Sequence, residues 1–297
     1  MTKTTRKPLT TKGVAQILGV SDATVKRWAD DELLLSEKTA GGHRRFNIEE
    51  VARFRRELSR SLRRPEANYP ISTPPKRRKL CATEAVRSSA KRSPYSIFDA
   101  LINGNEEEVK EILIGEYVRG RNLTIIFDEM ICPAMRRIGD LWYAGELTIA
   151  HEHLATRTVI TAVQALRGVL ASREPTDLLA VCCAVEDDFH ELPVLLAQTL
   201  IESEGWKVVS LGANTPFFTL QETMTRYAPQ LVCIAATILF DVDRAAREYQ
   251  EPRRAAARTS IKIVIGGAGF APEPVRQRFS ADLHAKSFGE LLKFIML

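Results

Sequence analysis

The sequence lacks the features that mark several large classes of protein. Its 297 residues contain no apolar run near the roughly 20 residues that a membrane-spanning helix needs, and the opening segment MTKTTRKPLT lacks the apolar core of a secretory signal. The five cysteines are odd in number and lack the paired Cys-x-x-Cys spacing of a zinc site. No Walker loop, nucleophile elbow or metal-hydrolase spacing is present. We therefore expect a cytoplasmic protein that is not an enzyme.

Basic residues are concentrated in the first third of the chain. Residues 1–97 carry 22 Lys and Arg against 10 Asp and Glu, whereas the remaining residues carry 20 against 27. A basic segment on an acidic body favours a polyanion as the partner of that segment alone. The KRRK cluster at 76–79 suits phosphate contacts, and equally a soluble tether. Length and composition predict four segments: a basic head at 1–62, a Pro-rich linker at 63–93, a helical domain at 94–174 and an α/β domain at 175–297.

The head has the pattern of a winged helix-turn-helix, which makes it all-α apart from the wing. A short amphipathic helix at 11–18 ends at Gly19, and Ser21 caps a second helix whose Val25 and Trp28 face inward. The side chains expected to face outward from this second helix are Thr24, Lys26 and Arg27. Such a helix enters the major groove, where Lys and Arg reach guanine edges or phosphates. We therefore expect it to read double-stranded DNA.

Two adjacent glycines predict a hairpin after the second helix, and three potential cations follow on one short strand. The expected wing consists of Gly42, His43, Arg44 and Arg45. A third helix at 48–62 adds further arginines. The alternative is a small three-helix domain with a solvated basic face. The combined spacing favours a recognition helix with a wing that grips the phosphate backbone.

Residues 94–174 are predicted to form a bundle of four antiparallel helices, because apolar residues recur at helical spacing throughout. Trp142 lies at the end of one predicted helix, and Glu152 and His153 lie near the start of the next. Across the short turn between these helices, the three side chains can converge on one spot. Alternatively, these residues are structural: Trp142 packs in the core, and the ring nitrogens of His153 have ordinary hydrogen-bond partners.

From residue 177 onward strands and helices alternate, which predicts a doubly wound parallel sheet of flavodoxin-like order. The continuous apolar run at 178–185 is typical of a buried parallel strand. Such sheets bind ligands at the carboxyl ends of their strands. Several candidate residues fall at these ends: Asp188, His190, Gly212, Thr237, Gly266 and Gly267.

His190 is the candidate metal ligand of this set. One ring nitrogen of His190 could bind a metal while Asp188 accepts the hydrogen of the other, which fixes the tautomer and makes the ligand more basic. Glycines at neighbouring strand ends, Gly212 and the pair at 266–267, allow a bulky group to lie against the backbone. The sequence therefore predicts a large, flat cofactor held by one axial histidine at the edge of the sheet.

Three motifs carry a resemblance to known families. Residues 9–58 resemble the DNA-binding domain of MerR-family regulators. The Asp-x-His motif at 188–190, followed by AAT at 235–237 and GG at 266–267, looks like the cobalamin-binding domain of methionine synthase and corrinoid proteins. The Trp-x9-Glu-His pattern at 142–153 resembles the helical cap over the upper corrin face in one branch of that superfamily. In this order, the motifs resemble cobalamin-dependent photoreceptor regulators of the CarH and LitR kind.

The resemblance implies a role for each candidate. His190 would be the lower axial ligand of cobalt, with Asp188 behind it. The cofactor's tail would run toward Gly212, Thr237, Gly266 and Gly267. An upper adenosyl group would be enclosed by Trp142, Glu152 and His153, so adenosylcobalamin is the expected form, with methylcobalamin or hydroxocobalamin as alternatives. The resemblance also implies a homo-oligomer (a dimer or a tetramer) that binds operator DNA in the nucleoid as a repressor and comes apart in light.

The sequence departs from that family pattern at three positions. Pro193 stands in place of a glycine, Ala235 in place of a frequent serine, and Tyr143 where such photoreceptors have a cobalt-capturing histidine. A phenol is a poor ligand at neutral pH, because its pKa lies near about 10. Three other interpretations therefore stay open: a light-independent cobalamin sensor, a regulator whose sensor domain has lost or changed its ligand, and a corrinoid module that carries methyl groups.

Overall fold

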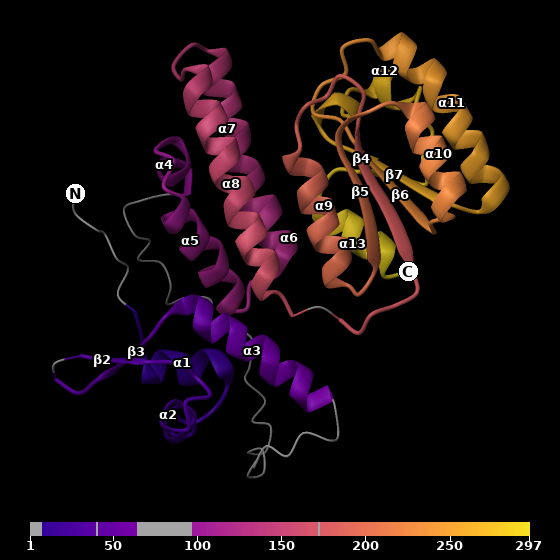
Figure 1. Cartoon of the computed structure of the whole chain (residues 1–297). Coiled ribbons are helices and arrows are strands. Elements are labelled where there is room, and N and C mark those ends of the chain that lie inside the picture. Colours follow the sequence, from indigo (N-terminus) through magenta and orange to yellow (C-terminus); the bar gives the residue numbers. More distant parts are fainter. Residues whose placement is uncertain (1–7, 40, 64–96, 172) are drawn as a thin grey trace.

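The computed structural model describes residues 8–39, 41–63, 97–171 and 173–297. It has three parts, which we call the head (8–63), the helical unit (97–171) and the sheet unit (173–297) (Figure 1). The predicted linker at 63–93 lies outside the described residues, apart from Arg63. Within the four described ranges, no helix is both long and apolar enough to cross a membrane.

The head contains two short helices and a longer third one. They are α1 (Thr11–Leu18), α2 (Asp22–Asp30) and α3 (Ile48–Arg63). Gly19 has a φ of 67°, in the left-handed region that favours glycine, and this allows the sharp turn between α1 and α2. Ser21 then caps α2 by accepting a hydrogen bond from a backbone N–H of its first turn. Val25 is fully buried, and Trp28 packs against the core of the head, as the helical spacing predicted.

Three short strands complete the head: β1 (Leu9–Thr10), β2 (Glu37–Lys38) and β3 (Arg44–Phe46). They form an antiparallel sheet in the order β1-β3-β2. The hairpin between β2 and β3 is closed by a hydrogen bond from Gly42 N to Thr39 O of 2.8 Å, and Gly42 has a φ of 77°. The sequence did not predict β1, because a strand of two residues is too short to show alternation. The head therefore has a sheet that an all-α description omits.

The helical unit consists of helices joined by tight turns. They are α4 (Ile97–Ile102), α5 (Glu106–Val118), α6 (Leu123–Ile125), the π-helical η1 (Ile126–Ile131), α7 (Cys132–Tyr143) and α8 (Ile149–Val169). The segments α6, η1 and α7 follow one another without a break. The π-helical stretch ends two residues before Pro133, which has no N–H to donate to the preceding turn.

Helix α8 is the longest element of the helical unit, and its 21 residues span roughly 30 Å. Gly145, with a φ of 76°, turns the chain back after α7. Thr148 caps α8 by accepting from His151 N, and the ring of His151 accepts from Thr148 N in return. This capping box makes His151 a structural residue of the helix start.

The sheet unit is built on five parallel strands in the order β5-β4-β6-β7-β8. They are β4 (Leu179–Val185), β5 (Lys207–Thr215), β6 (Leu231–Ala235), β7 (Lys262–Gly266) and β8 (Leu283–Ala285). This is the flavodoxin-like order that the sequence predicted. The sequence did not predict β8, because three half-buried residues carry no clear apolar run.

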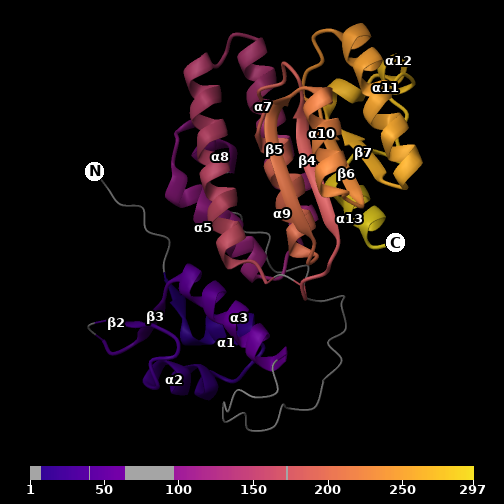
Figure 2. The ribbon, with the colours of Figure 1, turned by 45° about the vertical axis from the view of Figure 1, so that its right-hand side comes forward.

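Helices cover both faces of the sheet (Figures 1 and 2). On the face toward the helical unit lie α9 (Leu192–Ser203) and α13 (Phe288–Ile295). The opposite face carries α10 (Phe217–Tyr227) and α11 (Val242–Thr259), with the short η2 (Ala268–Phe270) and α12 (Glu273–Arg276) nearby. The alternating side chains of β4 explain this division. Cys182 and Ala184 belong to the core on the α9 face, whereas Val181 and Cys183 belong to the core on the α10 face.

Gly212 was expected just after a strand that ends at residue 211, and the structure corrects that boundary. Gly212 lies inside β5, which continues to Thr215. Its φ of 76° coincides with an irregularity in the pairing of β4 with β5, where Cys183 faces Gly212. A glycine in the left-handed region allows such a bulge without strain. The sequence pattern was read as a strand end because the alternation breaks at this residue.

Candidate cofactor-binding site

Asp188 organises the loop that follows β4. Its side chain is completely buried, and both of its carboxylate oxygens accept hydrogen bonds. Oδ1 lies 2.6 Å from His190 Nδ1 and 3.1 Å from His190 N, and Oδ2 accepts from Thr237 N at 2.5 Å. Burial by itself would raise the pKa of Asp188, but these hydrogen bonds outweigh it and hold the pKa below its usual value. Asp188 is therefore a fixed anion that joins the β4 loop to the β6 loop.

His190 presents its other ring nitrogen away from this anchor. Because Nδ1 is engaged by Asp188, Nε2 is the nitrogen left for an external ligand, and none of the described residues forms a hydrogen bond with it. The imidazole remains 42% exposed. The hydrogen bond to Asp188 raises the pKa of His190, and the charges of Asp188 and Glu152 raise it further against the effect of burial. The arrangement is that of a metal-binding histidine whose basicity and orientation a carboxylate sets.

Glu152 brings the helical unit to the same site. It lies in the first turn of α8, and its charge acts on the pKa of His190 in the sheet unit. Its Oε1 accepts a hydrogen bond of 2.8 Å from Thr156, which steadies the carboxylate on its helix. The ring of His153 lies 3.6 Å from Glu152 and is largely exposed. Of the predicted pair, Glu152 therefore lies close enough for its charge to act on the predicted axial histidine of the other unit.

Apolar side chains with much exposed surface occur beside these polar groups. Trp142 is 46% exposed at the end of α7, and the neighbouring Tyr143 is 90% exposed. On the sheet unit, Phe189 lies next to His190, and Ile238 lies next to Thr237; both are exposed. Soluble proteins seldom leave neighbouring large apolar groups in water without a reason. They suit the apolar flanks of a large flat ligand.

The three candidate glycines differ in what surrounds them. A Cβ at Gly267, whose φ is 104°, would lie 2.3 Å from Ala236 O, and a Cβ at Gly266 would lie 3.1 Å from Ala285 O. The chain's own backbone therefore explains both of these glycines. A Cβ at Gly212 would meet nothing within 4 Å. Gly212 is the position where a ligand could approach the backbone most freely.

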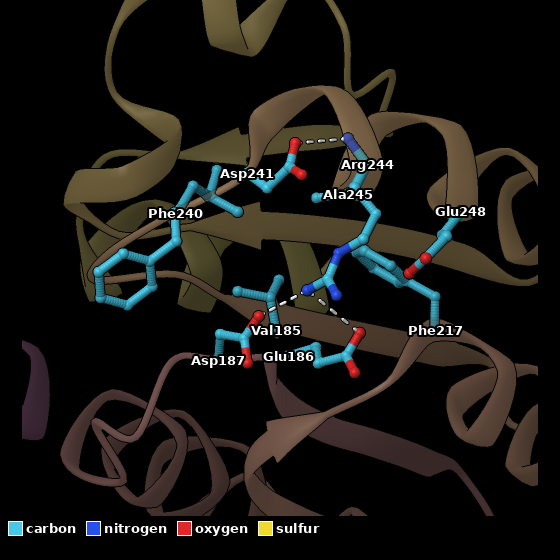
Figure 3. A pocket seen from close by; sticks show the side chains of 10 residues that line it. Val185, Glu186, Asp187, Phe217, Phe240, Asp241, Arg244, Ala245 and Glu248 are labelled. Carbon is cyan, nitrogen blue, oxygen red and sulfur yellow. Dashed lines mark hydrogen bonds and ion pairs between the residues drawn. The ribbon is translucent and has the colours of Figure 1, made fainter.

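Sequence reasoning missed three polar residues near the site: Asp187, Asn214 and Arg244. Asp187 and Asn214 have φ values of 64° and 51°, which side-chain-bearing residues rarely adopt. Arg244 comes from α11 and pairs with Asp187 (Figure 3). No spacing in the sequence reveals these contacts, because they join three segments that are far apart in the chain: the loop after β4, the end of β5 and the start of α11.

The predicted DNA-binding residues lie on α2 and on the hairpin of β2 and β3. Lys26 and Arg27 are exposed on α2, as expected. Thr24 Oγ1 lies 2.9 Å from Ser21 Oγ, so Thr24 also belongs to the helix cap. Arg44 forms an ion pair with Asp30 at the end of α2, and its side chain is only 16% exposed.

The position of each remaining wing candidate in the hairpin sets its exposure. His43 is exposed directly after the turn at Gly42, and Arg45 is half-buried. The ion pair of Arg44 ties the hairpin to α2. Lys26, Arg27 and His43 are therefore the exposed basic side chains among the predicted DNA-binding residues, whereas Arg44 holds two elements together.

Comparison with known protein families gives a match for the head and a match for the helical unit. A family model described as a helix-turn-helix domain matches residues 8–59, which run from before β1 into α3. A model described as a B12 binding domain matches residues 96–167, nearly the whole helical unit, including Trp142 and Glu152. The chain combines a helix-turn-helix domain with a B12-binding domain.

Individual relatives resemble the chain over different extents. The HTH-type transcriptional repressor CarA of Myxococcus xanthus is 26% identical over 288 residues, which cover 94% of this chain and 93% of CarA. Trimethylamine corrinoid protein 1 of Methanosarcina acetivorans is 23% identical over 195 residues, 65% of this chain and 88% of that protein. The solved monomethylamine corrinoid protein of Methanosarcina barkeri has a TM-score of 0.58 at 20% identity, over 67% of this chain and 95% of that one, which shows a common fold.

The residues at the site fit a corrinoid. Such a cofactor needs one axial nitrogen, apolar flanks for its ring and a path for its tail. His190 Nε2 could supply the first, and the exposed side chains of Phe189 and Trp142 could supply the second. Gly212 leaves open space at the edge of the sheet. Ala235 and Pro193 do not disturb this geometry: Ala235 ends β6 beside Gly266, and Pro193 lies in the first turn of α9, where its missing N–H is tolerated.

Proposed function

We propose that the protein is a cobalamin-responsive, DNA-binding transcriptional regulator, and that it acts as a repressor. The observation that carries this proposal is the Asp188–His190 pair, because it leaves His190 Nε2 exposed at the carboxyl edge of a doubly wound sheet in a chain with a helix-turn-helix head. The likeness to a transcriptional repressor over nearly the whole chain supports it. We take the protein to be a sensor rather than an enzyme.

The cofactor would lie between the sheet unit and the helical unit. His190 would ligate the lower face of cobalt, and the tail would run past Gly212 and Thr237 toward 266–267. The upper face would be covered by Trp142, Glu152 and His153. When bound, cobalamin in its adenosyl or methyl form would supply a cobalt–carbon bond that is sensitive to visible light. Asp188 would keep the imidazole in the tautomer that presents Nε2.

The head would bind operator DNA through α2 and the hairpin of β2 and β3 as a wing. Lys26 and Arg27 would reach the major groove, and His43 and Arg45 with the turn at Gly42 would lie near the phosphates. We assign Arg44 to holding the wing through Asp30. Two or four copies on one operator would gain affinity through effective concentration, so that a ligand-dependent change of assembly would control binding.

The decisive experiment combines cofactor binding with molecular mass. Purified protein is mixed in darkness with adenosyl-, methyl- or hydroxocobalamin, and the visible spectrum and mass are recorded before and after illumination. We expect bound cofactor whose spectrum changes in His190→Ala but not in the control His284→Gln, a histidine of β8. Protein that binds none of the three corrinoids would contradict the proposal. Binding without a mass change in light would leave a light-independent sensor.

A second measurement tests the head. Lys26→Ala should weaken binding to operator DNA and reduce the slope of log affinity against log salt by about one unit, because one phosphate contact is lost. An unchanged slope would remove α2 from the interface. The likeness to methylamine corrinoid proteins favours one alternative, a carrier of methyl groups. A chain that binds cobalamin but shows no measurable affinity for double-stranded DNA would support that alternative.

A further inference from the structure

The backbone around His190 has an unfavourable conformation that side chains from elsewhere hold in place. Asp187, three residues before His190, has a φ of 64°. A residue with a Cβ is disfavoured there, because Cβ approaches the following carbonyl oxygen. Backbone of this kind persists only where surrounding contacts determine it, and such positions concentrate at functional sites.

Asn214, near the end of β5, supplies one set of these contacts. Its Oδ1 accepts a hydrogen bond from Asp187 N at 2.9 Å, and its own N–H donates to Asp188 O at 2.8 Å. Asn214 itself has a φ of 51°. Asparagine tolerates this region better than most residues. One asparagine thus binds the main chain of two successive loop residues.

Arg244 supplies the other set from the first turn of α11. Its Nη2 donates to Asp187 Oδ2 at 2.5 Å and lies 3.5 Å from Glu186 Oε2 (Figure 3). Its backbone N–H donates to Asp241, the cap of α11, at 2.9 Å. The pairing raises the pKa of Arg244, whose charge is permanent in any case. The guanidinium therefore connects the β4 loop to the start of a helix on the far face of the sheet.

Together, these contacts connect the loop that carries His190 to the β6 loop and to α11. The β6 loop leaves the sheet at Thr237, whose N–H binds Asp188, and leads to α11, where Arg244 binds Asp187. The loop that carries the histidine is therefore tied to β6 and α11 on one side and to β5 on the other. Asp188 sets the direction of the imidazole, whereas Asp187 sets the position of the loop.

We propose that Asp187, Asn214 and Arg244 are positioning residues for the cofactor: they hold the loop of residues 186–190 in the shape that aims His190 Nε2 at a bound metal. This inference rests on the proposed cobalamin function and names part of its machinery. The residues act through His190 and do not touch the cofactor. A loop held in advance binds without the entropy loss of ordering it.

Substituting glycine for Asp187 separates an effect on cofactor binding from an effect on the stability of the fold. Asp187→Gly deletes the carboxylate that binds Arg244, yet glycine adopts the left-handed backbone without strain. We expect the apo-protein to melt at the same temperature or higher, while the dissociation constant for hydroxocobalamin rises about two- to fivefold, the range of one partly exposed ion pair. The visible spectrum should show a smaller fraction of histidine-ligated cobalt at saturation.

Arg244 allows a matched comparison on one helix. Arg244→Gln should weaken hydroxocobalamin binding by a similar factor, Arg244→Lys should restore part of it, and Arg244→Gln should add little to Asp187→Gly, because both remove the same contact. Arg254→Gln is the control, since Arg254 forms an exposed ion pair with Glu251 farther along α11. It should leave binding and spectrum unchanged.

The outcomes distinguish this inference from the proposed function. Wild-type binding and spectra in both Asp187→Gly and Arg244→Gln would overturn the positioning role and leave the cofactor proposal intact. A loss no larger than that of Arg254→Gln would also overturn it. If the wild-type protein takes up no hydroxocobalamin, the proposed function fails first, and the positioning role fails with it.

Discussion

The helical unit meets its two neighbours in different ways. Toward the head, α3 makes three polar contacts beside its apolar packing: Lys110 Nζ lies 2.8 Å from Glu49 Oε1, Arg55 donates to Val118 O at 3.0 Å, and Arg56 donates to a carbonyl at the end of α8. Ile48 adds an apolar contact near Gly115. These groups lie on α3 and near the ends of α5 and α8, where helix carbonyls lack partners within the helix.

Toward the sheet unit the contacts are deeper. Phe127 is fully buried and meets Phe288 edge to face, with ring centroids 5.4 Å apart. Asp128 accepts hydrogen bonds from Phe288 N (2.9 Å) and Gly289 N (3.0 Å), and so helps to cap α13 from another structural unit. Near the C-terminal end of α8, Arg167 forms an ion pair of 2.5 Å with Glu202 of α9.

The difference between these two junctions indicates which part of the molecule moves more easily. Burial of aromatic surface and a cap shared between units join the helical and sheet units firmly, so that the two sides of the candidate cofactor site stay together. Partly exposed ion pairs hold the head, and such pairs contribute little each. We therefore expect the head to separate from the rest at small cost, whereas the other two units act as one body.

The largest effect should follow from breaking the firm junction. Phe127→Ala removes a buried ring that both units share, and we expect a loss of about 3–5 kcal/mol in the free energy of unfolding. Because the units depend on each other, helical and sheet signals should still disappear together in denaturant. Two separate transitions in the wild-type protein would show that the junction is weaker than its packing suggests.

A medium effect should follow from Asp128→Ala. It deletes the acceptor of two backbone N–H groups at the start of α13, and loss of such a cap costs about 0.5–2 kcal/mol. Hydrogen exchange should accelerate at residues 288–289 before it changes elsewhere. Glu129→Ala, at the exposed neighbouring position, is the control and should leave the exchange pattern as it is.

The smallest effect should follow from Lys110→Gln at the head junction. One partly exposed ion pair contributes at most about 1 kcal/mol and is screened by salt. We expect faster hydrogen exchange in α3 and an unchanged unfolding midpoint for the sheet unit. Arg254→Gln, which breaks an exposed ion pair within α11 of the sheet unit, is the control. Equal exchange in α3 for both variants would contradict a role for this pair in docking.

The pH dependence of the same contact has a definite sign. The hydrogen bond to Glu49 raises the pKa of Lys110, so the contribution is complete below the ordinary lysine value of about 10.4 and is lost as pH rises through the raised pKa. Exchange in α3 should therefore depend on alkaline pH in the wild-type protein, beyond the intrinsic rate. Lys110→Gln should abolish that extra dependence.

Much of the candidate site could be predicted because its chemistry lies in short segments. Asp188 and His190 are two residues apart at the end of an apolar run, and a parallel strand must deliver them to the ligand-binding edge. Ser21 and Val25 likewise identify a capped amphipathic helix. Asp187 and Arg244 could not be paired in this way, because 57 positions separate them and the contact depends on how α11 returns over the sheet.

Arg44 shows the same limit in the head. As a sequence feature it is one cation among three beside a glycine turn, and nothing local separates a phosphate contact from a structural one. The fold places Asp30 against it, and so gives Arg44 a partner inside the protein. Gly267 was assigned to the cofactor for its lack of a side chain, and the structure shows that Ala236 O already requires that lack.

The sequence by itself determined the order of the parts, the parallel sheet and the histidine with its carboxylate, because periodicity and short spacings are local properties of a chain. Only the tertiary structure decided that the charge of Glu152 acts on His190, that Arg244 and Asn214 contact the loop beside it, and that different sets of contacts join the head and the sheet unit to the helical unit. These depend on which surfaces pack together, and packing is set by the summed burial of residues far apart in the chain.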